Sequence, residues 1–146
     1  MKDEFIQTLE AGLRKLKNEV DQYGDGESFW TVSDGVNNSA GNLCLHLLGN
    51  LNHYIGAKLG DSGYVRDRPS EFSSKNVPRE EILQRIDQTI GIVKESLEKL
   101  SEQEISNAYP SDEGEEPRSI ARELLRIANH FNYHLGQINY ARRLNS

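Results

Sequence analysis

The four histidines of the chain are the residues whose type and spacing could support chemistry. His130 and His134 are four residues apart, so on a helix they project from the same face, about 6 Å from each other. This spacing can bring two imidazoles to one metal ion, as in the helical histidine pair of zinc proteases. Those proteases carry a glutamate directly after the first histidine, whereas position 131 here is Phe, so that class of protease is excluded.

The other two histidines, His46 and His53, are seven residues apart, which is about 10.5 Å along a regular helix. They therefore cannot bind one ion together. His46, like His130 and His134, falls at the edge of an apolar helix face, and helix bundles build metal sites from such inward-facing side chains. Spacing alone leaves open which of the two would be a third ligand. It also leaves open a hydrogen-bonded polar seam between two helices instead of a metal site.

Four amphipathic helices are predicted to position these histidines, because apolar residues recur every three to four positions in four segments. The expected ranges are 3–22, 39–59, 78–100 and 117–144. No stretch alternates with period two for long enough to require a sheet. Each connection is over about 15 residues long, more than neighbouring antiparallel helices need, so one connection could cross over the bundle. The sequence thus predicts one all-α domain over residues 1–146, a four-helix bundle with long connections.

Composition excludes several classes of protein. The chain of 146 residues has a formal net charge of −6 and no basic face, which argues against a nucleic-acid binder. No apolar run approaches the ~20 residues of a membrane span, and the start, MKDEFIQTLE, does not resemble a signal peptide. The single cysteine, Cys44, lies about 160° around the helix from His46, so we expect it to be a buried apolar side chain. A cytoplasmic protein that binds neither nucleic acid nor membrane is expected.

Three segments resemble the DinB-like superfamily of bacterial four-helix proteins. They are NNSAGNLCLHLLGNLNHYIG at 37–56, YVRDRPSEF at 64–72 and ANHFNYHLGQINYARRL at 128–144. More narrowly, they are similar to a branch with an HL-x-GN helix and an RDR-x-x-EF loop. The likeness runs over the whole chain, and its most specific part is H-x-x-x-H-x-GQ together with the upstream histidine.

The resemblance implies an up-down-down-up bundle with a crossing connection, and a homodimer. It implies His46, His130 and His134 as ligands of a divalent metal ion, for which zinc and nickel are expected first. The better-understood relatives are transferases and isomerases that use bacillithiol, mycothiol or glutathione. A low-molecular-weight thiol is therefore an expected co-substrate, and a small molecule the expected substrate.

Three neutral imidazoles leave open positions on a divalent ion, as in catalytic sites. A bound water could then attack an ester or amide, or a bound thiolate could attack an electrophile. The expected function is thus a metal-dependent thiol transferase or hydrolase. The alternative is a metal-binding or small-molecule-binding bundle without turnover, which would act as a sensor or dimeric scaffold.

No general base can be identified from the sequence. Asn50 and Gln137 fall on the same helix edges as the expected ligands and could orient a water or substrate, and Glu123 is a more distant candidate. Arg66 could bind an anion. However, charges of both signs alternate closely over residues 66–71, which favours an arginine–carboxylate network that anchors the long loop.

Overall fold

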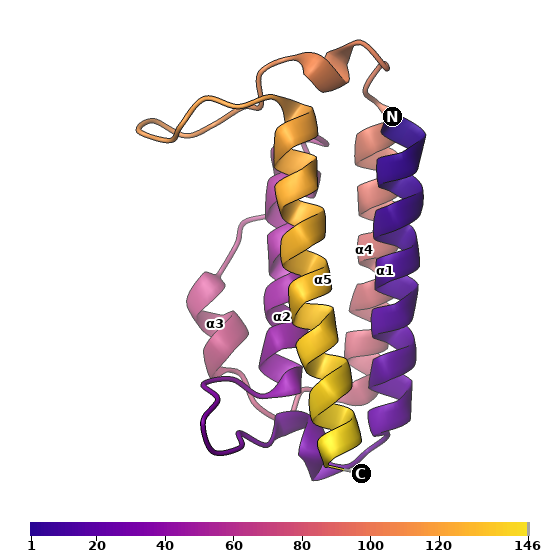
Figure 1. Ribbon diagram of the computed structural model, residues 1–146, viewed down its shortest axis with the longest axis vertical. Coiled ribbons are helices and arrows are strands. Elements are labelled where there is room, and N and C mark those ends of the chain that lie inside the picture. Colours follow the sequence, from indigo (N-terminus) through magenta and orange to yellow (C-terminus); the bar gives the residue numbers. More distant parts are fainter. Residues whose placement is uncertain (146) are drawn as a thin grey trace.

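The computed structural model describes residues 1–145, and over this range it is all-helical, without a named β-strand. Figure 1 shows the long helices side by side and a short helix next to them. The five α-helices are α1 (Lys2–Tyr23), α2 (Ala40–Leu51), α3 (Arg68–Ser73), α4 (Arg79–Glu98) and α5 (Ile120–Leu144). The predicted all-α class is confirmed. None of the described helices is both long enough and apolar enough to cross a bilayer.

The helices do not simply alternate in direction. In Figure 1, α1 and α5 run downward, and the Tyr23 hydroxyl donates to the Ile138 carbonyl near the C-terminal ends of both, at 2.8 Å. Helices α2 and α4 run upward, and the Asn52 amide donates to Thr89 Oγ1 between them, at 2.9 Å. Because α2 and α4 share a direction, the chain must return along the molecule between them. The connection 61–78 does this, and it contains α3.

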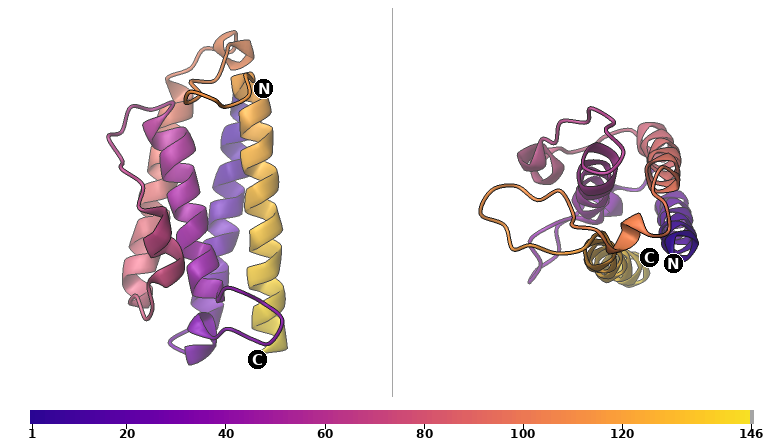
Figure 2. Two further views of the ribbon diagram at one scale, coloured as in Figure 1. Left: turned by 90° about the vertical axis from the view of Figure 1, so that its left-hand side faces the viewer. Right: turned by 90° about the horizontal axis from the view of Figure 1, so that it is seen from above.

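The apolar stripes predicted from the sequence form the core between the four long helices. The largest fully buried side chains are Leu9, Leu13, Leu16, Leu47, Leu51, Ile55, Ile82, Ile86, Leu97, Leu124, Ile127 and Ile138. Helix α2 differs from the others because each of its residues is buried. It contacts α3 as well as α4 and α5, and Figure 2 shows α3 outside the four long helices, beside α2. The polar side chains of α2, including that of His46, are therefore buried together with its apolar ones.

Three details differ from the expected elements. The segment 60–77, expected to be loop, contains α3, which begins at an Asp67 cap whose side chain accepts from the Ser70 amide. The second helix does not stay regular to residue 59, since a π-helical turn, Asn52–Ala57, follows α2 directly. The last helix begins at Ile120 rather than at 117, because the Ser119 side chain caps it by accepting from the Arg122 amide.

Candidate metal centre

Three of the four histidines meet between α2 and α5. One ring nitrogen from each of His46, His130 and His134 lies within 4.8 Å of the others. The ring centroids are 4.6 to 5.4 Å apart, and His46 Nε2 lies 3.0 Å from His130 Nε2. His46 comes from α2 and is only 6% exposed, while the α5 pair is partly buried. The predicted convergence of the three histidines is therefore present in the structure.

The fourth histidine, His53, does not join this cluster. It lies in the π-helical turn, where its ring packs edge-on against that of Tyr54 with the centroids 4.7 Å apart. Partial burial, with help from the positive charge of Arg66, lowers the pKa of His53. Spacing left open whether His46 or His53 joins His130 and His134, and in the structure it is His46.

His46 is held in place by a buried carboxylate. Its Nδ1 lies 3.0 Å from Glu71 Oε1, and Glu71 is 5% exposed. Arg66 binds the same carboxylate with both Nε and Nη2, each at 2.9 Å. Burial opposes ionisation of Glu71, but the hydrogen bonds from His46 and Arg66 outweigh it and keep the pKa of this carboxyl below its usual value. An ionised carboxylate only accepts hydrogen bonds, so Nδ1 of His46 is the donor, and in the neutral ring the lone pair is then on Nε2.

His134 is oriented in the same way by a neutral partner. Its Nδ1 lies 2.7 Å from Gln137 Oε1, three residues further along α5. A carbonyl oxygen also only accepts, so Nδ1 of His134 donates and its Nε2 is left free. Gln137, a weak candidate for substrate binding, thus has a definite contact with a candidate ligand. Asn50 lies one turn after His46 on α2 and is buried, at 5% exposed.

Both histidines of α5, His130 and His134, are in the neutral form that binds a metal ion. Burial, followed by the positive influence of His134, His46 and nearby arginines, lowers the pKa of His130 to about 4. Burial also lowers the pKa of His134, although its bond to Gln137 opposes this. Metal ligands must be neutral imidazoles, and both rings are neutral at pH 7. His130 Nδ1 is buried without a hydrogen-bond partner among the described residues. The donor set therefore fits a divalent ion that accepts imidazole nitrogen.

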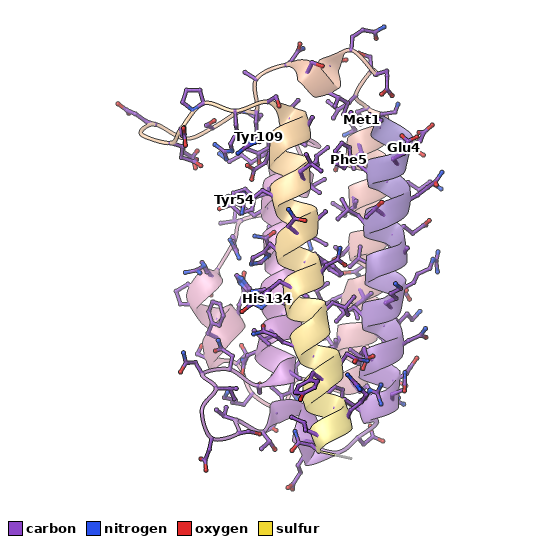
Figure 3. All side chains as sticks on the ribbon, viewed as in Figure 1. Met1, Glu4, Phe5, Tyr54, Tyr109 and His134 are labelled. Atoms are coloured by element: carbon purple, nitrogen blue, oxygen red, sulfur yellow. The ribbon has the colours of Figure 1, made fainter. Side chains whose placement is uncertain are left out.

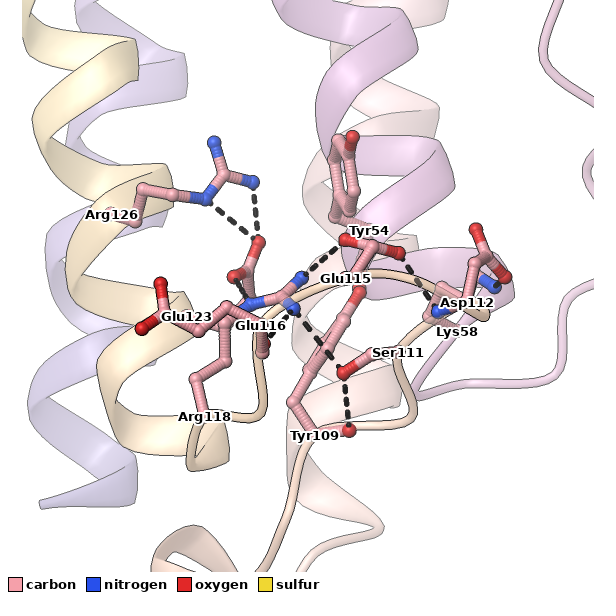
Figure 4. Close-up of polar contacts among 10 residues, drawn as sticks. All are labelled: Tyr54, Lys58, Tyr109, Ser111, Asp112, Glu115, Glu116, Arg118, Glu123 and Arg126. Atoms are coloured by element: carbon pink, nitrogen blue, oxygen red, sulfur yellow. Dashed lines mark hydrogen bonds and ion pairs between the residues drawn. The ribbon is translucent and has the colours of Figure 1, made fainter.

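Glu123, the more distant candidate for a base, has another role. It is fully buried, and its two carboxylate oxygens are bound by Arg118 and Arg126. Figure 4 shows how Arg118 also ties this carboxylate to the 108–118 segment, through Ser111 and the Glu116 carbonyl. A carboxylate held by two arginines is a poor proton acceptor, so Glu123 anchors the connection that leads into α5.

Two arginines near the histidine cluster, Arg66 and Arg126, both lie over one aromatic ring. The guanidinium of Arg126, one turn before His130, lies 4.9 Å from the centroid of the Tyr54 ring, and that of Arg66 lies 5.9 Å from it. Figure 3 shows Tyr54 and His134 on the same side of the molecule. The network predicted for 66–71 is confirmed for Arg66 and Glu71. Arg66 is therefore hydrogen-bonded to a protein carboxylate and is not free to bind an anion from solution.

Comparison with known proteins identifies a family for the chain but no curated relative. No curated protein matches the chain. One family model matches residues 1–146, and its description is "Protein of unknown function (DUF1572)". The match includes α2, α3 and α5, which together supply the three histidines and the carboxylate that supports them. The chain therefore belongs to the DUF1572 family.

Proposed function

We propose that the protein is a divalent-metal-dependent enzyme of the DinB-like kind, in which His46, His130 and His134 hold the ion. The observation that carries this proposal is the convergence of three imidazoles from two helices, with their ligand atoms within 4.8 Å. The Nδ1 atoms of His46 and His134 are already bonded to protein acceptors, which leaves Nε2 of each for an ion. The directions of the long helices, with the crossing connection 61–78, support the assignment to a DinB-like up-down-down-up bundle.

The surroundings favour a thiol over water as the nucleophile. A divalent ion in this site, zinc or nickel, would supply Lewis acidity and lower the pKa of the group bound to it. The buried carboxylates of Glu71, beside His46, and of Glu123, seven residues before His130 on α5, are both ion-paired with arginine and are not free to take a proton. A free thiol ionises near pH 8.5 and needs far less help than water. Thiol transfer to a small electrophile is thus the leading reaction, and hydrolysis the second.

The metal site can be tested before any substrate is known. Protein made without an affinity tag and without chelator should contain about one divalent ion per chain, measured by mass spectrometry of the metal content. The double variant His46→Ala/His130→Ala should contain none. His53→Ala is the matched control, because it removes a partly buried histidine of the same helical segment that lies outside the cluster, and it should keep the ion. Wild-type protein that takes up neither zinc nor nickel would overturn the proposal.

Turnover requires a second experiment. Metal-loaded protein is offered bacillithiol, mycothiol or glutathione together with simple electrophiles, and thioether formation is measured. Activity that disappears in His130→Ala supports the enzyme. Metal binding without turnover across the panel would favour the alternative, a non-catalytic binding bundle.

We further propose a homodimer, to be tested by light scattering, and a cytoplasmic location, because a thiol co-substrate needs a reducing compartment.

A further inference from the structure

The carboxylate that supports His46 comes from outside the four long helices. Glu71 lies on α3, in the connection between α2 and α4, and is 25 residues from His46 in sequence. Its Oε1 is bonded to His46 Nδ1 and Arg66 Nη2, and its Oε2 to Arg66 Nε. Replacing a buried ion pair of this kind by apolar residues often costs no stability, because both charges lose their hydration on burial. The arrangement therefore calls for an explanation other than stability.

The approach of Glu71 depends on a glycine in α2. A Cβ atom at Gly49 would lie 1.8 Å from Glu71 Oε2 and 2.5 Å from its Cδ, which is impossible without displacing the carboxylate. Glycine inside a helix costs about 1 kcal/mol relative to alanine. Gly49 lies three residues after His46, on a neighbouring part of the helix surface. Its missing side chain opens the space through which Glu71 reaches the histidine.

The backbone of α3 is also fixed beside His46. Asn42 Nδ2 donates to the carbonyls of Glu71 and Ser74, at 3.0 and 2.8 Å. The ring of Phe72 lies against that of His46, with centroids 4.8 Å apart. These contacts hold the C-terminal half of the short helix on α2, so the position of the Glu71 carboxylate does not depend on one hydrogen bond.

A donor and an acceptor both lie next to His46 Nδ1, and which of them bonds to it decides where the ring carries its proton. Arg66 Nη2 lies 3.3 Å from His46 Nδ1, slightly further than Glu71 Oε1. Without the carboxylate, Arg66 could donate to Nδ1, and the proton of His46 would then move to Nε2. A protonated Nε2 cannot bind a metal ion. With the carboxylate present, Nδ1 must be the donor and Nε2 stays available.

We infer that Glu71 is a positioning residue of the metal centre, which keeps His46 in the tautomer with the proton on Nδ1. This inference rests on the proposed function, in that it assumes an ion at His46 Nε2. Arg66 holds the carboxylate in place with two hydrogen bonds, and the missing side chain of Gly49 leaves room for it. The connection 61–78 is thereby part of the metal centre rather than only a link between helices.

The test compares Co(II) affinity, followed by the visible absorption of the bound ion, with the tautomer of His46, followed by ¹⁵N NMR of metal-free protein. Glu71→Ala should weaken Co(II) binding by about 10- to 100-fold, the usual effect of losing such a support. It should also shift the His46 proton to Nε2. Glu19→Ala is the matched control, because Glu19 is a buried carboxylate held by Arg142 and Asn139 and bonded to no histidine. Its Co(II) affinity should equal that of wild type.

A rescue separates positioning from a general loss of structure. The double variant Arg66→Met/Glu71→Ala removes the competing donor, so it should recover part of the affinity that Glu71→Ala loses. Gly49→Ala, which favours the helix but displaces the carboxylate, should weaken binding in the same direction and serves if Glu71→Ala does not fold. Affinity in Glu71→Ala equal to that in Glu19→Ala, or a proton on Nε2 of His46 in metal-free wild type, would overturn the inference. Wild type that binds no Co(II) would count against the proposed function alone, since the tautomer is still measurable.

Discussion

The only cysteine of the protein limits where a reactive thiol can come from. Cys44 lies two residues before His46 on α2, but it is fully buried in the core, as the sequence led us to expect. Burial raises the pKa of its thiol to about 12, so the group is protonated at neutral pH. Only the thiolate is nucleophilic. A thiol-dependent reaction in this protein must therefore use a thiol supplied from solution.

We predict that Cys44→Ala keeps full metal content and full thiol-transfer activity, with a loss of about 1 kcal/mol in the free energy of unfolding from the small cavity. In native wild-type protein the thiol should resist iodoacetamide at pH 8, and in urea it should react within minutes. Mass spectrometry of the labelled protein measures both rates. Equal labelling in the native and unfolded states, or loss of activity in Cys44→Ala, would contradict this account.

The histidine cluster was predictable from the sequence only in part. The spacing of His130 and His134 placed both on one helix face, and that required no tertiary information. The third ligand was named through the family resemblance, because spacing could not choose between His46 and His53. Glu71 was placed in a charged network but not on His46, since the contact joins distant segments. The one local signal was Gly49, a glycine inside an apolar helix, which often marks the close approach of another group.

At the scale of elements, the long helices were predictable and their short partners were not. Helix α3 has six residues, fewer than two turns, so no apolar periodicity can reveal it. The π-helical turn Asn52–Ala57 has no signature in the apolar stripe either. Helix α5 begins three residues later than the predicted 117, because the Ser119 side chain caps it. What escaped prediction are the segments whose shape depends on contacts with α2 and α5.

The connection into α5 gives a prediction for pH dependence. Burial alone would raise the pKa of Glu123, but the hydrogen bonds from Arg126 and Arg118 lower it below the usual value. A depressed pKa in the folded state means that this ion pair stabilises the fold above about pH 4.3, the unfolded value, and that the contribution is lost as the pH falls further. Glu123→Gln should reduce the free energy of unfolding by about 2 kcal/mol at pH 7. Between pH 4 and pH 3 its stability should approach that of wild type.

Urea unfolding at pH 7, 5, 4 and 3 measures this difference. Glu98→Gln is a suitable control, because Glu98 lies on the exposed face of α4 and its replacement should change stability little at pH 7. A difference between wild type and Glu123→Gln that stayed constant down to pH 3 would show that Glu123 does not act through its charge.

At the scale of the whole molecule, the histidine cluster joins two helices, α2 and α5, that are far apart in the sequence. His46 lies near the middle of α2, and its partners lie on α5, which follows only after the crossing connection and α4. An ion bound by all three histidines would act as a crosslink between α2 and α5 that exists only in the folded state, because unfolding separates the ligands. Metal binding should therefore raise the stability of the entire bundle rather than that of one helix.

For an ion present at 100 times its dissociation constant, this linkage amounts to about 2.7 kcal/mol. In a chain of this size that corresponds to a rise of roughly 5–10 °C in Tm. Differential scanning calorimetry with and without Zn(II) should show the shift as one cooperative transition in wild type and in His53→Ala, and no shift in His134→Ala. One cooperative transition is expected because α2 contacts α3, α4 and α5. A purely local effect of zinc would instead split the transition or leave its midpoint unchanged. Either result would mean that the three histidines do not bind the ion together in the folded protein.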